Sequence, residues 1–269
     1  MRVSYRLFTW YSFQRSLIGC VWNVSSDSAI AIIPARYQST RLPGKPVIKV
    51  SGKTLIEHVY RRVEQAGLIE RILVATDDER IAKAVQGFGG NVTMTRMDHQ
   101  SGTDRLAEAA ASLPPDTLIV NVQGDEPLIE PEVIDRAIAA ARLGDAEIVT
   151  LRTKLSDRTA IEDPNRVKVV VDNLGFALYF SRSPVPSAGT TFLHLGLYVY
   201  RAGFLKRFTQ LERTPLEIAE RLEQLRALEH GFHIRVVEVE SATWGIDTPA
   251  DLEKFKSLFG ETAREGVNG

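Results

Sequence analysis

The sequence is poor in cysteine, because Cys20 is the only one among its 269 residues. An intrachain disulfide is therefore impossible, which fits a reducing compartment. The five histidines form neither a cysteine-histidine cluster with the spacing of zinc ligands nor an H-E-x-x-H motif. We therefore expect neither a disulfide framework nor a structural zinc site.

A strong net charge is also missing, since 33 basic and 34 acidic residues leave a formal charge of -1. A surface that follows nucleic-acid phosphates usually produces a basic excess, so no nucleic-acid partner is expected. Long apolar runs are absent as well. Near the N-terminus, Gln14 and Arg15 interrupt the apolar stretch before it reaches the roughly 20 residues of a membrane span. No membrane partner is expected.

The first 27 residues differ from the rest of the chain. They contain Arg2, Arg6 and Arg15 but only one acid, Asp27, a composition shared with targeting segments. They lack the longer apolar core and small-residue cleavage site of a signal peptide. We expect residues 1–27 to be an unstructured or mis-assigned extension, with a targeting signal as the alternative. The functional domain should begin near Ser28.

Residues 28–151 alternate short apolar runs with amphipathic segments. Strands are expected at 30–33, 72–75, around 92, 118–122 and 148–151. Helices are expected at 54–66, about 81–87, a stretch ending near 113, and 131–143. This alternation predicts an α/β fold with a doubly wound, mostly parallel sheet covered by helices on both faces.

After residue 154 the pattern changes. Residues 167–171 and 176–180 predict an antiparallel hairpin, and 195–200 a further strand. Helices at 202–210 and 216–229, a strand at 234–239 and a helix at 249–258 should follow. No linker separates the halves, so we expect one domain over 28–258 with a smaller antiparallel subregion, and a flexible tail at 259–269.

The first expected strand is followed by a loop rich in positive charge. Arg36, Arg41 and Lys45 lie here beside two prolines and a glycine, which fix the bends of the chain. Cations and backbone N–H groups at the end of a strand suit a polyphosphate. The alternative is a solvated basic loop without a ligand.

Two aspartates follow other expected strands. Ligands of doubly wound sheets bind beyond the carboxyl ends of the strands, so Asp125 and Asp247 should lie near the basic loop. Their hard oxygens are suitable Mg²⁺ ligands, and phosphates would complete the coordination shell. For Asp247 the alternative is a helix N-cap, because Thr248 and Pro249 begin a helix.

Two other nucleotide motifs fail. Ser51-Gly52-Lys53-Thr54 matches the end of a P-loop, but Val47 stands where the upstream glycine is required. No G-x-G-x-x-G follows the first strand, which disfavours dinucleotide binding. His58 is expected on a helix surface.

Six blocks in this order resemble the 3-deoxy-manno-octulosonate cytidylyltransferase family: IIPARYQSTRLPGKP, TRMDHQSGTDR, VNVQGDEP, ALYFSR, HLGLYVYR and LEQLR. The similarity covers nearly all of residues 30–258. It implies a nucleotidyltransferase-type fold and transfer of CMP from CTP to the anomeric hydroxyl of 3-deoxy-manno-octulosonate (Kdo), with release of pyrophosphate. It also implies Mg²⁺ as cofactor, a role in lipopolysaccharide biosynthesis, and a cytoplasmic homodimer whose antiparallel subregion binds sugar and forms the dimer.

The resemblance also implies roles for individual residues. It assigns the triphosphate to Arg36, Arg41 and Lys45, and the magnesium to Asp125 and Asp247. Together, Lys45, Arg36, Asp125 and Asp247 form the implied catalytic set. The cytosine and ribose would be lined by Arg96, Ser101, Gly102 and Thr103, and Gln123 would lie between nucleotide and sugar. The segments facing the sugar contain Arg182, His194, Tyr198, Glu223 and Gln224.

Some alternatives stay open. The segment between Pro186 and His194 is shorter and less charged than in many family members, which would admit an amino-substituted Kdo. A CMP-sialate or other nucleotide-sugar transferase could use the same sheet, and a non-catalytic nucleotide-binding regulator is the alternative outside enzymes. Leucines and an alanine spaced by three residues indicate that helix 216–229 serves core or dimer packing. No general base is assigned.

Overall fold

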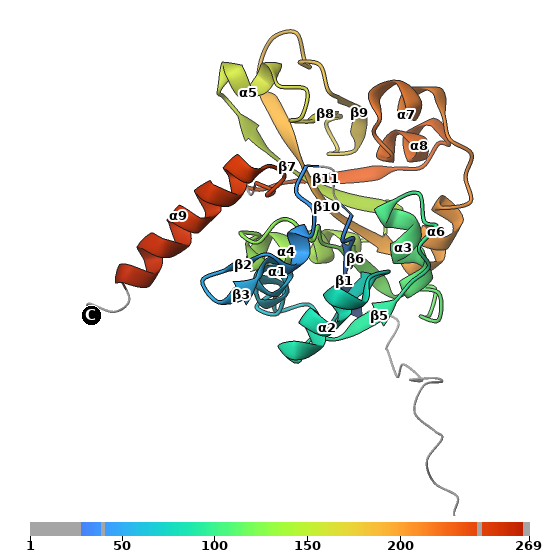
Figure 1. The fold of residues 1–269 in the computed structure, drawn as a ribbon. Coiled ribbons are helices and arrows are strands. Elements are labelled where there is room, and N and C mark those ends of the chain that lie inside the picture. Colours follow the sequence, from blue (N-terminus) through green and yellow to red (C-terminus); the bar gives the residue numbers. More distant parts are fainter. Residues whose placement is uncertain (1–27, 39–40, 241–243, 266–269) are drawn as a thin grey trace, which may run out of the picture.

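The computed structural model describes residues 28–38, 41–240 and 244–265, with side chains as far as Leu258. The expected extension at 1–27 and the last residues of the expected tail lie outside this range. Figure 1 shows one mixed α/β body with a central sheet, as predicted. Its described strands form a nine-stranded sheet and a separate two-stranded hairpin.

The parallel part of the sheet consists of four strands in the order β6-β1-β4-β5. They are β1 (Ala29–Ala35), β4 (Arg71–Thr76), β5 (Val92–Met94) and β6 (Leu118–Asn121). Strand β1 is parallel to both of its neighbours, with Ile32 opposite Leu73 on one side and Asn121 on the other. Its apolar sequence is buried along almost its whole length, as expected for a central strand covered on both faces.

Side chains that alternate along β1 pack into two separate cores. Ala31 and Ile33 join a cluster with α1 (Leu55–Val63), α2 (Glu79–Gly87) and α4 (Pro131–Ala141). Ile30 and Ile32 point to the opposite face, where α3 (Gly102–Ala109) and α6 (Ala202–Phe208) cover the sheet. Successive strand residues point to opposite faces, so two apolar cores give the doubly wound arrangement.

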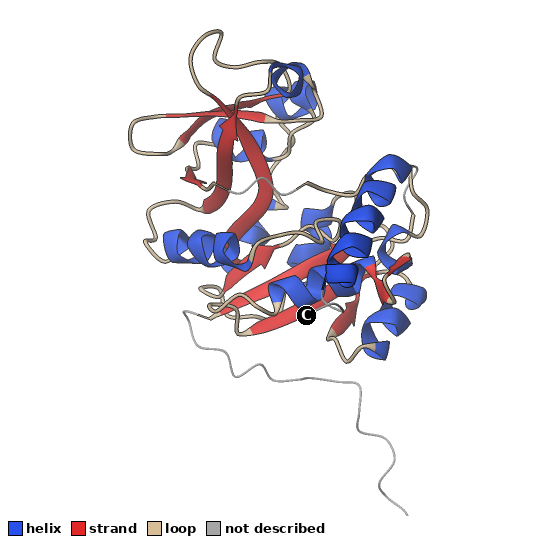
Figure 2. Cartoon of the chain, turned by 90° about the vertical axis from the view of Figure 1, so that its left-hand side faces the viewer, coloured by secondary structure: helices blue, strands red, loops and turns tan. Residues whose placement is uncertain are grey.

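The second half of the chain extends the sheet to the order β11-β7-β10-β6. Strand β10 (Thr191–Arg201) is antiparallel to both β6 and β7 (Ile148–Leu155), and β11 (Ile234–Glu238) is parallel to β7. The hairpin β8 (Lys168–Val171) and β9 (Ala177–Ser181) joins β10 at Leu193. Figure 2 shows strands rising from the helix-covered part into this smaller subregion.

Several short elements were not predicted. They are the 3₁₀ turn η1 (Lys45–Val47), the hairpin of β2 (Lys49–Val50) and β3 (Lys53–Thr54), and α5 (Arg158–Glu162). The expected helix 216–229 is two helices, α7 (Pro215–Glu220) and α8 (Gln224–Glu229), because Arg221 between them has φ 54° and ends α7. Helix α9 (Pro249–Glu265) continues past residue 258 into the expected tail.

The expectation for His58 was wrong. Its side chain is buried, its Nε2 lies 2.9 Å from the carbonyl of Val50, and its ring meets Phe255 of α9 edge-on. The unpredicted β2–β3 hairpin supplies that carbonyl. Within the described residues, no helix is both long and apolar enough to cross a membrane.

Candidate functional site

Lys45 lies between the two aspartates that the sequence singled out. Its Nζ donates to Asp125 Oδ2 at 2.8 Å and to Asp247 Oδ1 at 3.0 Å. Arg41 approaches the same Asp247, with Nη2 3.5 Å from Oδ2. The prediction that these aspartates lie close together beside the basic loop is therefore confirmed.

A glycine turn places Lys45. Gly44 has φ 68°, the left-handed region that favours glycine, and its N–H donates to the carbonyl of Tyr37. A Cβ added here would lie 3.0 Å from the Tyr37 hydroxyl, so glycine is required by both conformation and space. The chain then enters η1, with Pro46 near its start, and Lys45 is held at the entrance of this turn.

The loop after β6 carries Asp125. A Cβ on Gly124 would lie 3.0 Å from the carbonyl oxygen of Pro34, so only glycine allows this close approach to the end of β1. On the other side, the N–H of Ile246 donates to the carbonyl of Asp125 at 2.8 Å. These two contacts fix Asp125 against both the first strand and the segment that carries Asp247.

The neighbouring threonine, rather than Asp247, caps helix α9. The N–H of Asp251 donates to Thr248 Oγ1, and the Asp251 carboxylate accepts from the N–H of Thr248 in return. This is a reciprocal capping box. The Asp247 N–H also donates to Asp251 Oδ2, which fixes the backbone while the Asp247 carboxylate faces Lys45 and Arg41. The N-cap alternative for Asp247 is thereby excluded.

The electrostatics of Lys45 reflect this position. Burial lowers its pKa, but the charges and hydrogen bonds of Asp125 and then Asp247 more than offset burial, so the pKa lies above its ordinary value. The ammonium is therefore protonated throughout the neutral range. Lys45 thus provides a permanent positive charge at the carboxyl edge of the sheet.

Arg36 connects the basic loop to the predicted nucleotide loop. Its Nη2 donates to the carbonyls of His99 and Ser101, at 2.9 and 2.8 Å. Ser101 caps α3 through a capping box with Asp104. A Cβ on Gly102 would be in ordinary contact with Pro34 at 3.8 Å, so the start of α3 lies directly over the end of β1.

The loop before α3 is also held by a buried arginine, Arg105, that the sequence did not indicate as a site residue. Arg105 of α3 is fully buried and donates to Asp77 Oδ2 at 2.7 Å and to Thr95 Oγ1. Asp77 follows β4 and Thr95 follows β5, so one side chain connects these two loops to α3. The only signal in the sequence was that both partners follow predicted strands.

Two of the predicted sugar residues, His194 and Tyr198, lie side by side on β10. The ring of His194 lies between Phe180 and Tyr198, with centroids 5.0 and 5.4 Å away, and its Nε2 lies 2.9 Å from Thr150 Oγ1. Burial lowers the pKa of His194 to about 3 and raises that of Tyr198. Both side chains are therefore neutral at neutral pH and can offer only uncharged hydrogen bonds.

Glu223 connects the predicted nucleotide and sugar residues. Its Oε2 accepts from Thr103 Oγ1 at 2.5 Å, across 120 positions of sequence. Burial raises the pKa of this carboxyl above its ordinary value despite that hydrogen bond. Gln224 is buried beside it, and the amide of Gln123 donates to the carbonyl of Gly196 in β10 at 3.2 Å.

Two other predicted cations, Arg182 and Arg96, contact neighbouring protein groups. Arg182 donates through its guanidinium to the carbonyls of Pro164, Glu220 and Arg221, so its hydrogen bonds hold the end of α7. Arg96 is exposed, and its Nε lies 3.6 Å from Asp98 and 3.7 Å from Glu108. The sugar role of Arg182 and the nucleotide role of Arg96 remain predictions.

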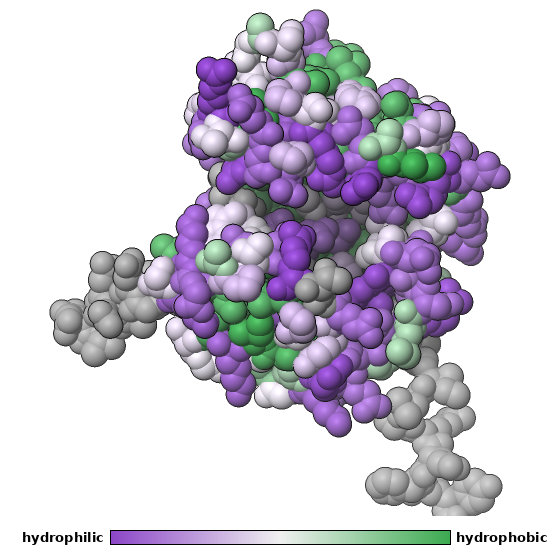
Figure 3. All heavy atoms as spheres, turned by 45° about the horizontal axis from the view of Figure 1, so that its top comes forward, coloured by the Kyte–Doolittle hydropathy of each residue, from purple (hydrophilic) through white to green (hydrophobic). Residues whose placement is uncertain are grey.

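A cavity of about 480 Å³ lies beside these residues. One wall comes from the start of α3 and includes Ser101, and the opposite wall comes from α7 and α8 and includes Glu223. Figure 3 shows a cleft across this face of the molecule, bordered by hydrophilic residues. Of the residues predicted for the nucleotide and the sugar, Ser101 and Glu223 line this cavity.

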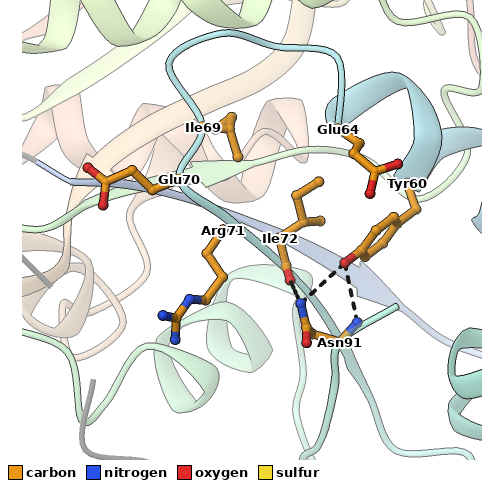
Figure 4. Close-up of a pocket in the computed structure, with 7 residues that line it drawn as sticks. All are labelled: Tyr60, Glu64, Ile69, Glu70, Arg71, Ile72 and Asn91. Carbon is orange, nitrogen blue, oxygen red and sulfur yellow. Dashed lines mark hydrogen bonds between the residues drawn. The ribbon is translucent and has the colours of Figure 1, made fainter. Parts of the chain in front are cut away.

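A second cavity, of about 360 Å³, lies at the opposite edge of the sheet, where β4 begins (Figure 4). There the Tyr60 hydroxyl accepts from the backbone N–H and the side-chain amide of Asn91, and that amide also donates to the carbonyl of Ile72. This cavity lies at the amino ends of the strands, far from the paired aspartates, and we do not assign the reaction to it.

Asp125 and Asp247 fit a divalent cation. Both carboxylates already contact one positive charge, the Lys45 ammonium. Two carboxylates that reach the same cation are close enough to coordinate one metal ion. Their oxygens are the donors that Mg²⁺ prefers. No cluster of three or more His, Cys, Asp or Glu suited to a metal occurs among the described residues. A pair of carboxylates is sufficient where substrate phosphates and water supply the other ligands.

Comparison with known proteins identifies the family. The model of a family described as "Cytidylyltransferase" matches residues 30–238. The chain belongs to this family. A protein of Syntrophotalea carbinolica named 3-deoxy-manno-octulosonate cytidylyltransferase is 52% identical over 246 residues, which cover 86% of this chain and 98% of that protein. A protein of Geobacter metallireducens with the same name is 53% identical over 242 residues, covering 83% and 94%.

Solved structures agree with this assignment of the chain to the cytidylyltransferases. A CMP:2-keto-3-deoxy-manno-octonic acid synthetase complexed with CTP is 44% identical, with a TM-score of 0.83, and the match covers 87% of this chain and 99% of that one. A 4-diphosphocytidyl-2C-methyl-D-erythritol synthase from Anaerococcus prevotii shares the fold, with a TM-score of 0.59 at 18% identity. The resemblance found in the six sequence blocks is therefore confirmed at the level of the family and the fold.

Proposed function

We propose that the chain is the enzyme that transfers CMP from CTP to Kdo, releasing pyrophosphate and activating the sugar for lipopolysaccharide biosynthesis. The observation that carries this proposal is the convergence of Asp125, Asp247 and Lys45 beside the basic loop, in a member of the cytidylyltransferase family. The relatives named for Kdo and the structure complexed with CTP support the choice of substrates.

In this reaction the anomeric oxygen of Kdo attacks the α-phosphorus of CTP in line. The new P–O bond forms, the bond to the bridging oxygen breaks, and pyrophosphate leaves with that electron pair, while the sugar hydroxyl gives up its proton. The protein contributes mainly positioning and positive charge. Lys45, Arg36 and Arg41 lie on the loop that receives the triphosphate, and Lys45 keeps its charge at neutral pH.

Asp125 and Asp247 would hold Mg²⁺ in this enzyme. When bound, the ion neutralises phosphate charge and lowers the pKa of a coordinated hydroxyl, so no side chain is required as a general base. The nucleotide would extend from the basic loop toward Ser101, Gly102 and Thr103. His194, Tyr198 and Glu223 would contact the sugar through uncharged or hydrogen-bonded groups. We further propose a homodimer located in the cytoplasm, which light scattering and cell fractionation can test.

The test is pyrophosphate release by the purified chain with CTP, Kdo and Mg²⁺. We expect Asp125→Ala to abolish turnover while its melting temperature stays close to that of the parent, because the carboxylate acts on the substrates. Asp116→Ala, which removes an exposed acid before β6, is the matched control and should keep full activity. Near-normal turnover of Asp125→Ala would overturn the assignment.

Metal dependence is tested in the same assay. Excess EDTA should stop pyrophosphate release, and Mg²⁺ added beyond the chelator should restore it. A panel of acid sugars, including an amino-substituted Kdo and sialic acid, then decides the substrate, since the short segment 187–193, which leads into β10, is the expected place of variation. Pyrophosphate release with another acid sugar in preference to Kdo would replace the proposed substrate but keep the reaction.

A further inference from the structure

Two adjacent aspartates lie where β4 ends, and their partners lie on opposite faces of the sheet. Asp77 directly follows β4, and Asp78 caps α2 by accepting from the N–H of Arg80 at 2.9 Å. Asp77 pairs with Arg105 of α3, whereas Asp78 pairs with Arg80 of α2. Helices α3 and α2 cover opposite faces, and successive residues of an extended chain point to opposite sides. Each carboxylate therefore contacts a different layer of helices.

The contact between Asp77 and Arg105 holds the predicted nucleotide loop. Arg105 is fully buried, its Nη2 donates to Asp77 Oδ2 at 2.7 Å, and its Nη1 donates to Thr95. Its Nε has no hydrogen-bond partner among the described residues, so burying this cation has a cost. Apolar side chains of similar volume often stabilise a protein as well as a buried ion pair does. The pair is therefore better explained by the position it gives to α3, which begins with Ser101 as its cap and Gly102 as its first residue.

The contact between Asp78 and Arg80 supports the basic loop through an aromatic ring. Nε and Nη2 of Arg80 donate to the two carboxylate oxygens of Asp78, at 2.9 and 2.6 Å, which fixes the plane of the guanidinium. This guanidinium lies over the ring of Tyr37, 3.2 Å from its centroid. The Tyr37 carbonyl accepts from the N–H of Gly44, and the Tyr37 hydroxyl limits the space beside Gly44. Asp78 thus supports the turn that precedes Lys45.

We propose that Asp77 and Asp78 are positioning residues that set the two halves of the CTP site relative to each other. Asp77 positions the loop for cytosine and ribose, and Asp78 positions the loop for the triphosphate. This inference rests on the proposed function, since it concerns one of its two substrates. Each carboxylate acts through an arginine and does not need to touch the nucleotide. Removing one of the two contacts should therefore weaken binding of one half of CTP and not of the other.

The first test concerns the cytosine half. Calorimetry with Mg²⁺ gives the Kd for CTP, for UTP, and for CMP, which lacks the β- and γ-phosphates. We expect Asp77→Asn to weaken CTP and CMP alike, about 10-fold, the usual effect of losing a hydrogen bond between charged groups, and to reduce the preference for CTP over UTP. Asp77→Asn leaves a buried cation, which can lower stability. Combined with Arg105→Met, which removes that cation, it should show the same losses with a melting temperature close to that of the parent.

The second test concerns the triphosphate half. Arg80→Ala removes the cation over Tyr37 and should raise the Kd for CTP about threefold, the effect of losing an exposed cation–π contact. The Kd for CMP and the preference for CTP over UTP should not change, and Arg80→Lys should recover part of the loss. Arg235→Ala is the matched control. Arg235 also pairs with an aspartate, Asp145, and lies over the ring of Phe176, but at the amino end of β7, so its removal should leave every Kd unchanged.

Two results would overturn the proposal. One is an unchanged affinity for CMP and an unchanged preference for CTP over UTP, both in Asp77→Asn and in its combination with Arg105→Met. The other is an Arg80→Ala variant that binds CTP as the parent does, or that loses CMP and CTP alike. These measurements do not need the sugar. A parent that binds CTP but releases no pyrophosphate with Kdo would overturn the proposed function, while the binding constants would still decide this inference.

Discussion

At the scale of single residues, the site is defined by charges whose partners are widely separated in sequence. Lys45 meets Asp125 across 80 positions and Asp247 across 202. The rule that ligands bind beyond the carboxyl ends of parallel strands was enough to predict this grouping from the order of the motifs. The position of Lys45 between the carboxylates could not be predicted, because it depends on the left-handed Gly44 and on the contact of Gly124 with Pro34.

Replacing Lys45 tests the role of its charge. Lys45→Met keeps the length of the side chain but removes the ammonium, so Asp125 and Asp247 lose the charge between them, while Arg41 still lies 3.5 Å from Asp247. We expect turnover to fall by at least 100-fold, as when one preorganised electrostatic contact is removed. Lys49→Met, an exposed lysine of β2, should have no effect in the same pyrophosphate assay. Comparable rates for the two variants would contradict the role of Lys45.

His194 should make stability depend on pH. Its pKa in the folded protein is about 3, below the ordinary value of 6.5, so the unfolded chain binds the extra proton between these values. The free energy of unfolding therefore falls as pH drops below about 6.5, by about 2 kcal/mol on reaching pH 5. Urea titrations at pH 7 and pH 5 should show this loss in the parent and a smaller one in His194→Gln. Equal losses in both proteins would refute the prediction.

At the scale of elements, the capping box of α9 fixes the backbone of Asp247. Thr248→Ala removes the hydroxyl that accepts from Asp251 and should cost about 1 kcal/mol of stability. Because the same box fixes the backbone of Asp247, the variant should also need more Mg²⁺ for half-maximal turnover. Ser257→Ala, which removes an exposed hydroxyl of α9 that donates to the carbonyl of Lys254, is the control. A loss of stability without any change in the Mg²⁺ requirement would contradict a role of the capping box in positioning Asp247.

The long elements were predicted and several of the short ones were missed, for a physical reason. Strands β1, β4 and β6 carry runs of buried apolar residues, and α1 and α4 carry apolar stripes, so their patterns are visible in the sequence. The hairpin of β2 and β3 has two-residue strands, too short for any period. The break in the expected helix 216–229 depends on one residue with positive φ, in a segment whose spacing of leucines is continuous.

In the candidate site, too, some residues could be predicted from the sequence and others could not. The residues on loops that follow long strands were found by their position, as with Arg36, Lys45 and Asp125. Arg105 was not, since nothing in a helical arginine indicates that it will be buried between Asp77 and Thr95. Neither could the sequence show that the Arg182 guanidinium donates to backbone carbonyls. Such distinctions depend on the tertiary structure.

At the scale of the whole molecule, the family match begins at residue 30 and β1 begins at Ala29. The expectation that residues 1–27 lie outside the functional domain therefore stays a prediction with a direct test. A chain that begins at residue 28 should keep its melting temperature within about 2 °C, because small changes in stability shift this value by only a few degrees. It should also keep its rate of pyrophosphate release. A fall in either would assign the segment a role in the fold or the reaction.

The placement of Lys45 has a consequence for the order of events at the two aspartates. Before substrate arrives, these carboxylates already have a built-in counter-ion, and a divalent cation must compete with it. In the proposed reaction the triphosphate would give the Lys45 ammonium a second anionic partner, and this would leave the two carboxylates free for the metal. Metal and nucleotide should therefore bind cooperatively: calorimetry with Mg²⁺ alone should give weak binding that becomes tight once CTP is present, and in Lys45→Met this difference should shrink.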